Sequence, residues 1–345
     1  MKKILLFKIG AIGDVVMTTP LVRQLRKSFP DAQIDYAVGK PANKVLENNK
    51  YINEVISFEA KKTPSAILKF APFISKIRKR KYDAVFMFDR HLILNSTAQL
   101  FGAKELIGFD RLGKEGVGLT HKVYFDGSKH EIQYYLELGK KYGAKIDTKD
   151  VRPDVFITKK DEKFAESIFK KYKLGKNTIC IAPGGAKNPG QSISLKLWPE
   201  ERYAELIEQL VKNNNIVLVG DKNDTKTGEW IINKVKSNKV VNMIDKTTIQ
   251  ETAALMKKSA AIICNDTGPM HIASAVNSHV ISIFGPTDPN RFSPLSRGST
   301  YIWKKKDKKP CNDIYGSFKS CEGVNYTEEV SVNDVFGAVK KVLGK

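Results

Sequence analysis

The chain has 345 residues, 41% of them hydrophobic and 28% charged, with 58 lysines and arginines against 37 aspartates and glutamates. This length exceeds what one hydrophobic core usually serves and predicts two domains, while no stretch is apolar enough and long enough to cross a bilayer. The net charge of +21 predicts attraction to polyanions, although nucleic acid, anionic lipid and phosphorylated glycolipid all satisfy it.

In the first half, short β-branched runs alternate with amphipathic stretches, a rhythm typical of a parallel sheet built from βαβ units. The N-terminal apolar run is too short for a signal peptide, so we interpret it as a buried strand and expect a cytoplasmic protein. The expected strands cover residues 4–9, 33–38, 54–58, 84–88 and 105–108, with a helix over 131–142. A proline-containing stretch at 150–158 and a charged helix over 159–173 indicate a domain boundary.

The alternation restarts in the second half and predicts a second Rossmann-like unit. Its expected strands cover residues 178–182, 216–219, 239–241, 261–264 and 280–284. Helix starts are indicated by Pro199 ahead of two glutamates and by Thr248 with Glu251 three residues later. The last segment, 331–343, carries its apolar residues on one helical face.

Two glycines and an aspartate follow the first strand, in the run K-I-G-A-I-G-D at 8–14. Gly10 and Gly13 lie where open α/β sheets bind ligands, and they would let a phosphate or sugar approach the backbone. Their G-x-x-G spacing lacks the G-x-G pair of a dinucleotide site and argues against a dehydrogenase. Asp14 is either the N-cap of the next helix or an exposed carboxylate that takes a proton from an attacking hydroxyl, and the two roles are compatible.

A second glycine-rich segment follows strand 178–182 and leads to K-L-W-P-E at 196–200. Backbone amides of Gly184 and Gly185 together with the Lys196 ammonium could hold a diphosphate. The alternatives are a solvated charge for Lys196 and simple packing for Trp198.

The most specific motif is N-D-T-G-P-M-H at 265–271, after a buried strand and at the start of a helix. Amides at Thr267 and Gly268 would face an anion, and Asp266 can cap the helix or bind a hydroxyl. His271 adds a hydrogen bond or a positive charge, or is a packed residue. Because F-G-P-T-D-P at 284–289 ends the neighbouring strand, several ligand-type loops converge on one sheet edge.

These segments resemble glycosyltransferase family 9, whose best-known members are lipopolysaccharide heptosyltransferases. The resemblance rests on K-I-G-A-I-G-D-V-V-M-T-T-P, K-L-W-P-E-E-R-Y-A-E-L and N-D-T-G-P-M-H-I-A-S-A with F-G-P-T-D-P, in that order along nearly the whole chain. It implies an α/β GT-B fold, with two Rossmann-like domains facing a cleft. We expect an acceptor domain at 1–158, a donor domain at 159–330 and a C-terminal helix at 331–345 that packs back on the first domain.

The resemblance also implies an inverting transfer without metal or cofactor, from a nucleotide diphosphate sugar to a lipopolysaccharide-type or other anionic glycan. ADP-heptose is the default donor. Asp14 matches the family's catalytic aspartate, Lys196 the lysine at the donor phosphates, and Asp266, Thr267, Gly268 and His271 the donor loop. Asp224 is a candidate for the donor ribose, although D-x-N-D at 221–224 superficially suggests a metal site. The insertion N-P-G-Q-S-I-S near the donor phosphates leaves donor identity open.

Family resemblance places an acceptor-facing basic region near Lys61 and Lys62, on a predicted surface helix within 61–81. These lysines could meet phosphate on a glycolipid, and the remaining charge favours peripheral contact with an anionic membrane, with no nucleic acid as partner.

Two other classes compete with this interpretation: a sugar-nucleotide epimerase of the same fold and a noncatalytic polyanion-binding protein. Cys180 and Cys264 fall in predicted strands as small hydrophobes, whereas Cys311 and Cys321 either pair or form part of a metal site.

Overall fold

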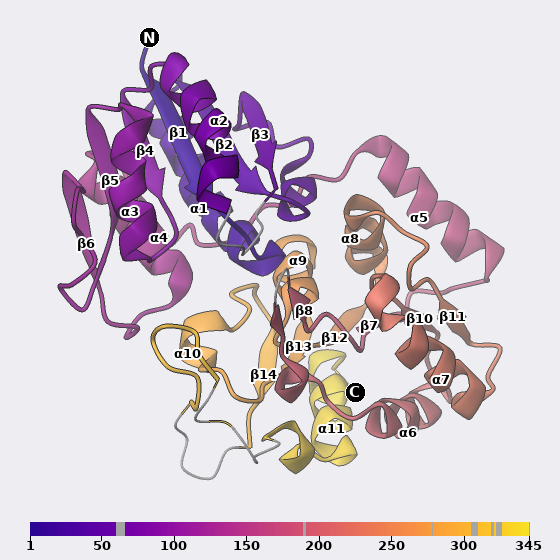
Figure 1. Cartoon of the computed structure of the whole chain (residues 1–345). Helices are drawn as coiled ribbons and strands as arrows, with labels where there is room; N and C mark the ends of the chain where they lie inside the picture. The colour runs from indigo at the N-terminus through magenta and orange to yellow at the C-terminus, as the bar shows by residue number, and fades with distance from the viewer. Residues whose placement is uncertain are drawn as a thin grey trace. The chain divides into compact units, whose positions relative to one another are not determined.

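A computed structural model describes residues 1–59, 66–188, 191–277, 279–304, 310–318, 321 and 326–344. The chain divides into two compact units, Met1–Asp154 and Val155–Lys345. Each unit is a parallel six-stranded sheet with helices against it, which confirms the α/β class (Figure 1).

The first unit has the strand order β3-β2-β1-β4-β5-β6. Its strands are β1 (Lys3–Lys8), β2 (Gln33–Gly39), β3 (Glu54–Phe58), β4 (Ala84–Met87), β5 (Glu105–Arg111) and β6 (His121–Phe125). The helices include α1 (Ile12–Ser28), α2 (Ala66–Lys79), α3 (Leu92–Ala98) and α4 (Glu131–Lys141), and 3-10 turns cover Ala42–Leu46 and Gln99–Phe101. All strand pairs are parallel, with Ile4 of β1 opposite Ile34 of β2 and Ala84 of β4.

The second unit repeats this plan as β11-β10-β7-β12-β13-β14. Its strands are β7 (Ile179–Ala182), β10 (Ile216–Leu218), β11 (Val240–Asn242), β12 (Ala261–Asn265), β13 (Val280–Ile283) and β14 (Thr300–Ile302), beside a small hairpin of β8 (Lys187–Asn188) and β9 (Gln191–Ser192). The helices include α5 (Lys159–Lys171), α6 (Glu200–Leu210), α7 (Thr225–Val235), α8 (Ile249–Lys258), α9 (Gly268–Val276), α10 (Pro289–Phe292) and α11 (Val332–Val342). Further 3-10 turns cover Ser194–Lys196, Lys222–Asp224 and Tyr326–Glu329.

In both sheets the first strand of the unit lies between the second and the fourth. The chain therefore winds outward in both directions from the gap between the first and fourth strands, which is the topological switch point where doubly wound folds bind ligands. The two switch points are β1/β4 in the first unit and β7/β12 in the second.

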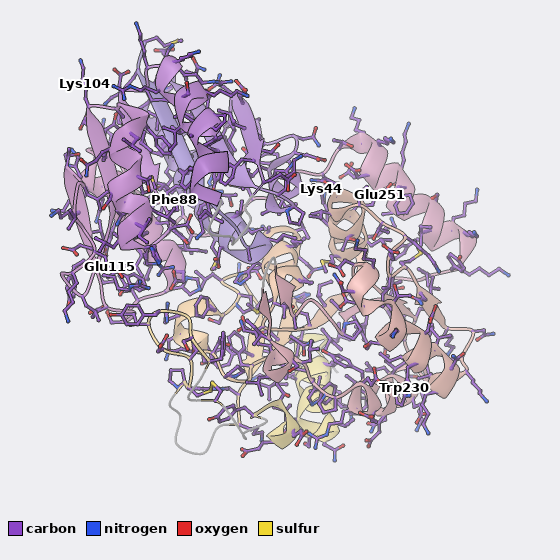
Figure 2. The ribbon with its side chains drawn as sticks, in the orientation of Figure 1. Lys44, Phe88, Lys104, Glu115, Trp230 and Glu251 are labelled. Carbon is purple, nitrogen blue, oxygen red and sulfur yellow. A yellow bond between two sulfur atoms is a disulfide. The ribbon has the colours of Figure 1, made fainter. Side chains whose placement is uncertain are left out.

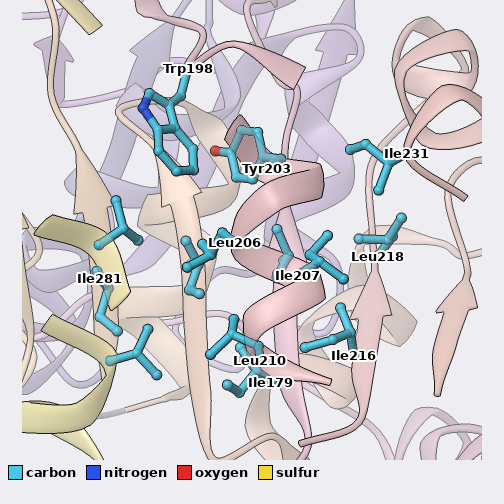
Figure 3. Close-up of a cluster of buried hydrophobic side chains, with 14 of the residues drawn as sticks. Ile179, Trp198, Tyr203, Leu206, Ile207, Leu210, Ile216, Leu218, Ile231 and Ile281 are labelled. Atoms are coloured by element: carbon cyan, nitrogen blue, oxygen red, sulfur yellow. The ribbon is translucent and has the colours of Figure 1, made fainter. Parts of the chain in front are cut away.

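The second unit's core is built on Trp198 and Tyr203, which meet edge to face with ring centroids 4.9 Å apart (Figure 3). Side chains of β7, β10, α6 and α7 surround them (Figure 3). Helix α11 adds Val332, Val335 and Val339 to this core and packs against α6. The C-terminal helix therefore belongs to the core of the second unit, because its apolar face covers the side chains around Trp198. Its packing against the first unit stays a prediction.

Central strands match the expected ranges to within one residue at most ends, because continuous apolar runs mark them. The edge strand β6 was not predicted, since only Val123 and Phe125 of it are buried. The expected helix over 61–81 is confirmed from Ala66, with Phe70, Phe73 and Ile77 packed into the first core.

Cys311 and Cys321 form a disulfide, and Cys180 and Cys264 are buried thiols. Among the described residues no three His, Cys, Asp or Glu side chains gather in a way that would hold a metal ion. In the same part of the chain, no helix has the length and apolar character needed to cross a bilayer.

Candidate active site

The turn from β1 into α1 carries the first set of predicted residues. Gly10 has φ +144°, a backbone conformation that side-chain-bearing residues rarely adopt, which accounts for glycine there. Helix α1 begins after Ala11, whose backbone is the N-cap, and no side chain caps it. Asp14 is the third residue of the helix, so its carboxylate is not the N-cap but lies in the first turn, where the helix dipole favours negative charge.

Asp14 lies over a buried ion pair at the β1/β4 switch point. The Lys8 Nζ atom is 2.7 Å from Asp89 Oδ1 and 3.6 Å from Asp14 Oδ2. The other Asp89 oxygen accepts a 2.7 Å hydrogen bond from the Ile9 amide, so Asp89 is fixed to β1 by both oxygens. The side chain of Asp14 is 40% exposed and that of Lys8 only 4%, so of these groups the Asp14 carboxylate is the one that a substrate can reach.

A second buried ion pair lies beside the first. Arg90 reaches Glu131 with both guanidinium nitrogens, at 2.6 and 3.2 Å, and stacks 3.9 Å above the Phe125 ring. Glu131 is the first residue of α4, and the phenol of Tyr135, one turn later, is buried without a hydrogen-bond partner among the described residues. Phe88, which precedes Asp89 and is labelled in Figure 2, is buried and meets Tyr135 edge to face with ring centroids 5.4 Å apart.

The pKa values of this cluster follow from burial and pairing. Burial alone would lower the pKa of Lys8, but the Asp89 carboxylate outweighs it and the pKa lies above its usual value. Burial likewise opposes the charge of Arg90, yet Glu131 keeps the pKa of that guanidinium raised. Burial raises the pKa of Tyr135, which therefore stays a neutral phenol. Lys8 and Arg90 are consequently permanent cations.

The second set of predicted residues lies at the β7/β12 switch point. A Cβ atom on Gly184 would lie 1.9 Å from Asp224 Oδ1, so glycine is required for close approach of the two loops. The same Asp224 oxygen accepts the Gly185 amide at 3.1 Å, and its partner oxygen accepts the Asp221 amide. We had expected the Gly185 N–H to face outward toward a phosphate. In the structure it is instead bonded to Asp224 within the protein.

Lys196 meets the D-T-G-P-M-H motif directly. Its Nζ is 2.8 Å from Asp266 Oδ2, and the Thr287 hydroxyl donates to the same oxygen. The Asp266 side chain is 2% exposed and that of Lys196 is 17% exposed, so the ammonium is the outer member of the pair. Thr287 belongs to the F-G-P-T-D-P segment, which confirms that these loops converge.

Asn265 ties the loops together from below. Its Oδ1 accepts hydrogen bonds from the Trp198 amide and the Tyr203 hydroxyl, both at 3.0 Å. Its Nδ2 donates to the Pro183 carbonyl at 2.8 Å. The strand end carrying the glycines, the segment after Lys196 and the start of α9 are thus fixed to one buried amide.

Helix α9 starts beside this network with Thr267 as N-cap and Gly268 as its first residue. The Thr267 hydroxyl contacts the Gly184 carbonyl at 3.4 Å, and His271 is buried one turn into the helix. The first turn of α9, Lys196 and the glycine-rich loop therefore share one sheet edge.

Most predicted site residues are thus found in two groups, with Gly10, Gly13 and Asp14 in the first unit and the donor-loop residues in the second. Asp89 and Arg90 were missed, although their position in the turn that follows β4 at a switch point is a signal that could have found them. Thr287 and Asn265 were missed as contacts because no sequence pattern indicates a pairing across strands. Lys61 and Lys62 lie outside the described residues.

The model of glycosyltransferase family 9 (heptosyltransferase) matches residues 71–321. The chain belongs to glycosyltransferase family 9. This family 9 enzyme is 25% identical to lipopolysaccharide heptosyltransferase 3 of Escherichia coli over 350 residues, with 96% of each chain covered.

Two solved structures share the fold of this glycosyltransferase. The family 9 glycosyltransferase of Veillonella parvula DSM 2008 has a TM-score of 0.81 at 21% identity, covering 99% of this chain and 97% of that one. E. coli ADP-heptose lps heptosyltransferase II has a TM-score of 0.77 at 20% identity, covering 99% and 98%. Because the chain belongs to a family of glycosyltransferases, the two competing interpretations, an epimerase and a noncatalytic polyanion-binding protein, are disfavoured.

Proposed function

We propose that this family 9 glycosyltransferase moves a sugar from a nucleotide diphosphate donor to a hydroxyl of a lipopolysaccharide-type glycan, with inversion and without a metal. The observation that carries the proposal is that the two switch points present side chains of opposite charge. One presents an accessible carboxylate, Asp14, and the other presents an ammonium, Lys196, beside a helix N-terminus. A base and a site for a leaving diphosphate are the two requirements of an inverting displacement.

In the proposed reaction Asp14 accepts the proton of the acceptor hydroxyl as that oxygen bonds to the anomeric carbon. The bond from the anomeric carbon to the diphosphate breaks on the opposite face, and its electron pair leaves with the nucleotide diphosphate. The carboxylate is ready for this step because it is exposed in the first turn of α1 and is not engaged as a helix cap.

The donor is proposed to lie at the second switch point with its diphosphate near Lys196. The ammonium and the amides of the first turn of α9, at Gly268, supply positive charge as the diphosphate departs. Asp266 and Thr287 hold the lysine in place, and Asp224 supports the glycine-rich loop through Gly185. A contact of Asp224 with the donor ribose stays a prediction, as do roles for Thr267 and His271 in donor binding.

ADP-heptose is the donor we propose, because a structural relative with the same fold is an ADP-heptose lps heptosyltransferase. The acceptor is proposed to be an anionic glycolipid at the inner face of the cell membrane. The net charge of +21 supports this, since phosphorylated glycolipid and anionic headgroups attract a basic protein. Lys61 and Lys62 stay candidates for the acceptor phosphate.

The test is an assay of the purified protein with ADP-heptose, with and without a deacylated lipopolysaccharide core as acceptor. We expect ADP release that depends on acceptor, a product whose anomeric configuration is opposite to that of the donor by NMR, and unchanged rates in the presence of a chelator. Epimerised ADP-sugar without acceptor would identify the epimerase instead, and retention of configuration would refute the proposed displacement.

A further inference from the structure

The proposed base belongs to a cluster of five charged side chains. The cluster contains two cations and three carboxylates, which come from β1, α1, the turn after β4 and the start of α4: Lys8, Asp14, Asp89, Arg90 and Glu131. The titratable side chains that face this cluster also include Tyr36 of β2 and Tyr135 of α4, and burial raises the pKa of both phenols, so both are neutral.

Two of the three carboxylates are committed to the cations. Asp89 is 2.7 Å from Lys8 and also bonded to the Ile9 amide, and Glu131 binds Arg90 through both oxygens. Asp14 is the more distant partner of Lys8, at 3.6 Å, and by far the most exposed of the three.

We infer that Asp89 is a positioning residue for the transfer, because it neutralises Lys8 permanently and so leaves Asp14 able to accept a proton. Lys8 is the second positioning residue, because its ammonium orients the Asp14 carboxylate. This inference rests on the proposed role of Asp14 as the base.

The physical reason is the cost of a buried unpaired cation. A buried ammonium must keep a counter-ion, and removing the partner of a buried pair is strongly destabilising. If Asp14 were the sole partner of Lys8, each proton transfer to Asp14 would leave the ammonium unpaired. With Asp89 in place, protonation of Asp14 leaves two cations facing two carboxylates, so the cluster is then neutral.

Two substitutions separate this role from a merely structural one, because they shift the pH profile of kcat/KM in opposite directions. Lys8→Met removes the positive charge next to Asp14, so the carboxyl protonates more easily and the acidic limb moves to higher pH. The direction of this displacement, which follows from the loss of an opposite charge beside the carboxylate, is the readout.

Asp89→Asn leaves Asp14 as the nearest counter-ion of Lys8. The acidic limb is then expected to move to lower pH, and kcat to fall by about 10- to 100-fold because the base holds its negative charge too firmly for efficient proton transfer. The dissociation constant for the ADP-sugar is expected to stay unchanged in both variants. Lys8→Arg, which keeps the charge, is expected to restore the limb toward the wild-type pH.

The control is Glu54→Gln in the same unit. Glu54 is the first residue of β3, and its carboxylate pairs with Arg80. The substitution is expected to leave the pH profile unmoved. Circular dichroism and ADP-sugar binding verify folding, and if Lys8→Met does not fold, the direction of the shift in Asp89→Asn decides alone, with Asp89→Glu as its charge-conserving partner.

The inference would be overturned if the acidic limb of the kcat/KM profile did not move in Lys8→Met and Asp89→Asn, or moved in the same direction in both. This holds even if Asp14→Asn is inactive. Full activity of Asp14→Asn would instead overturn the proposed function itself. The two failures are therefore distinguishable.

Discussion

The two units of this glycosyltransferase share a strand order but carry different polar side chains at their switch points. At β1/β4, buried ions lie beneath an accessible carboxylate. At β7/β12, a neutral amide, Asn265, ties three segments together below a single ion pair. The same backbone plan therefore presents a base at one switch point and a cation at the other, and a few side chains decide which.

The largest effect we expect in the second unit is from Lys196→Ala. Loss of the ammonium beside the leaving diphosphate is expected to lower kcat/KM by a factor of about 10² to 10³, as removal of one charge-stabilising donor does. Steady-state kinetics measure it, with the exposed Lys212→Ala as a matched control that keeps wild-type rates. A loss below threefold would break the assignment of the cation to this switch point.

Asn265→Ala tests the neutral scaffold. The substitution leaves the Trp198 amide, the Tyr203 hydroxyl and the Pro183 carbonyl without their buried partner and is expected to lower the free energy of unfolding by about 3 kcal/mol. All three tryptophans lie in the second unit, so fluorescence during urea denaturation reports it. Asn213→Ala, at an exposed site, should change the midpoint little, and an equally small effect of Asn265→Ala would show that the scaffold contributes no stability.

Gly184→Ala tests the close approach of the glycine-rich loop to Asp224 in the second unit. The added Cβ overlaps the Asp224 carboxylate, which is fixed by two backbone amides, so the loop must shift and ADP-sugar binding is expected to weaken about tenfold. Isothermal titration calorimetry measures the change. In the control Gly337→Ala the added atom meets nothing within 4 Å in α11, so unchanged binding is expected there.

The smallest effect concerns a carboxylate of the first unit outside the charged cluster. A hydrogen bond from Tyr134, followed by bonds from Ser128, lowers the pKa of Asp126 to about 2. Because the folded pKa is depressed, its contribution to stability is present above the unfolded value of about 3.9 and is lost as pH falls toward 2.

Tyr134→Phe is expected to raise the pKa of Asp126 toward its ordinary value, which carboxyl NMR titration measures. The profile of kcat/KM should not change. A shifted profile would mean that the pH response of catalysis extends beyond the Asp14 cluster.

Sequence patterns predicted the parts of this protein whose signals are local. Continuous apolar runs located β1 and β12, and Thr248 with Glu251 forms the predicted capping box. The edge strand β6 was not predicted because it buries only alternate residues, and the contribution of α11 to the second core was not predicted because an apolar face does not indicate its partner.

Within the candidate site, glycines, Asp14 and Lys196 stood out because they belong to short motifs. Asp89 did not, because its significance lies in a contact with Lys8 across 81 positions of sequence. The commitment of the Gly185 amide to Asp224 was likewise invisible, since it joins two loops that are separated by 39 positions.

The most direct test of the central claim is single-turnover kinetics of Asp14→Asn together with its affinity for the ADP-sugar. We expect a transfer rate lower by a factor of about 10² to 10⁴ and an unchanged dissociation constant, because the carboxylate acts on the proton and the donor is proposed to bind the other unit. A rate within a few-fold of wild type, or a loss of affinity as large as the loss of rate, would contradict it.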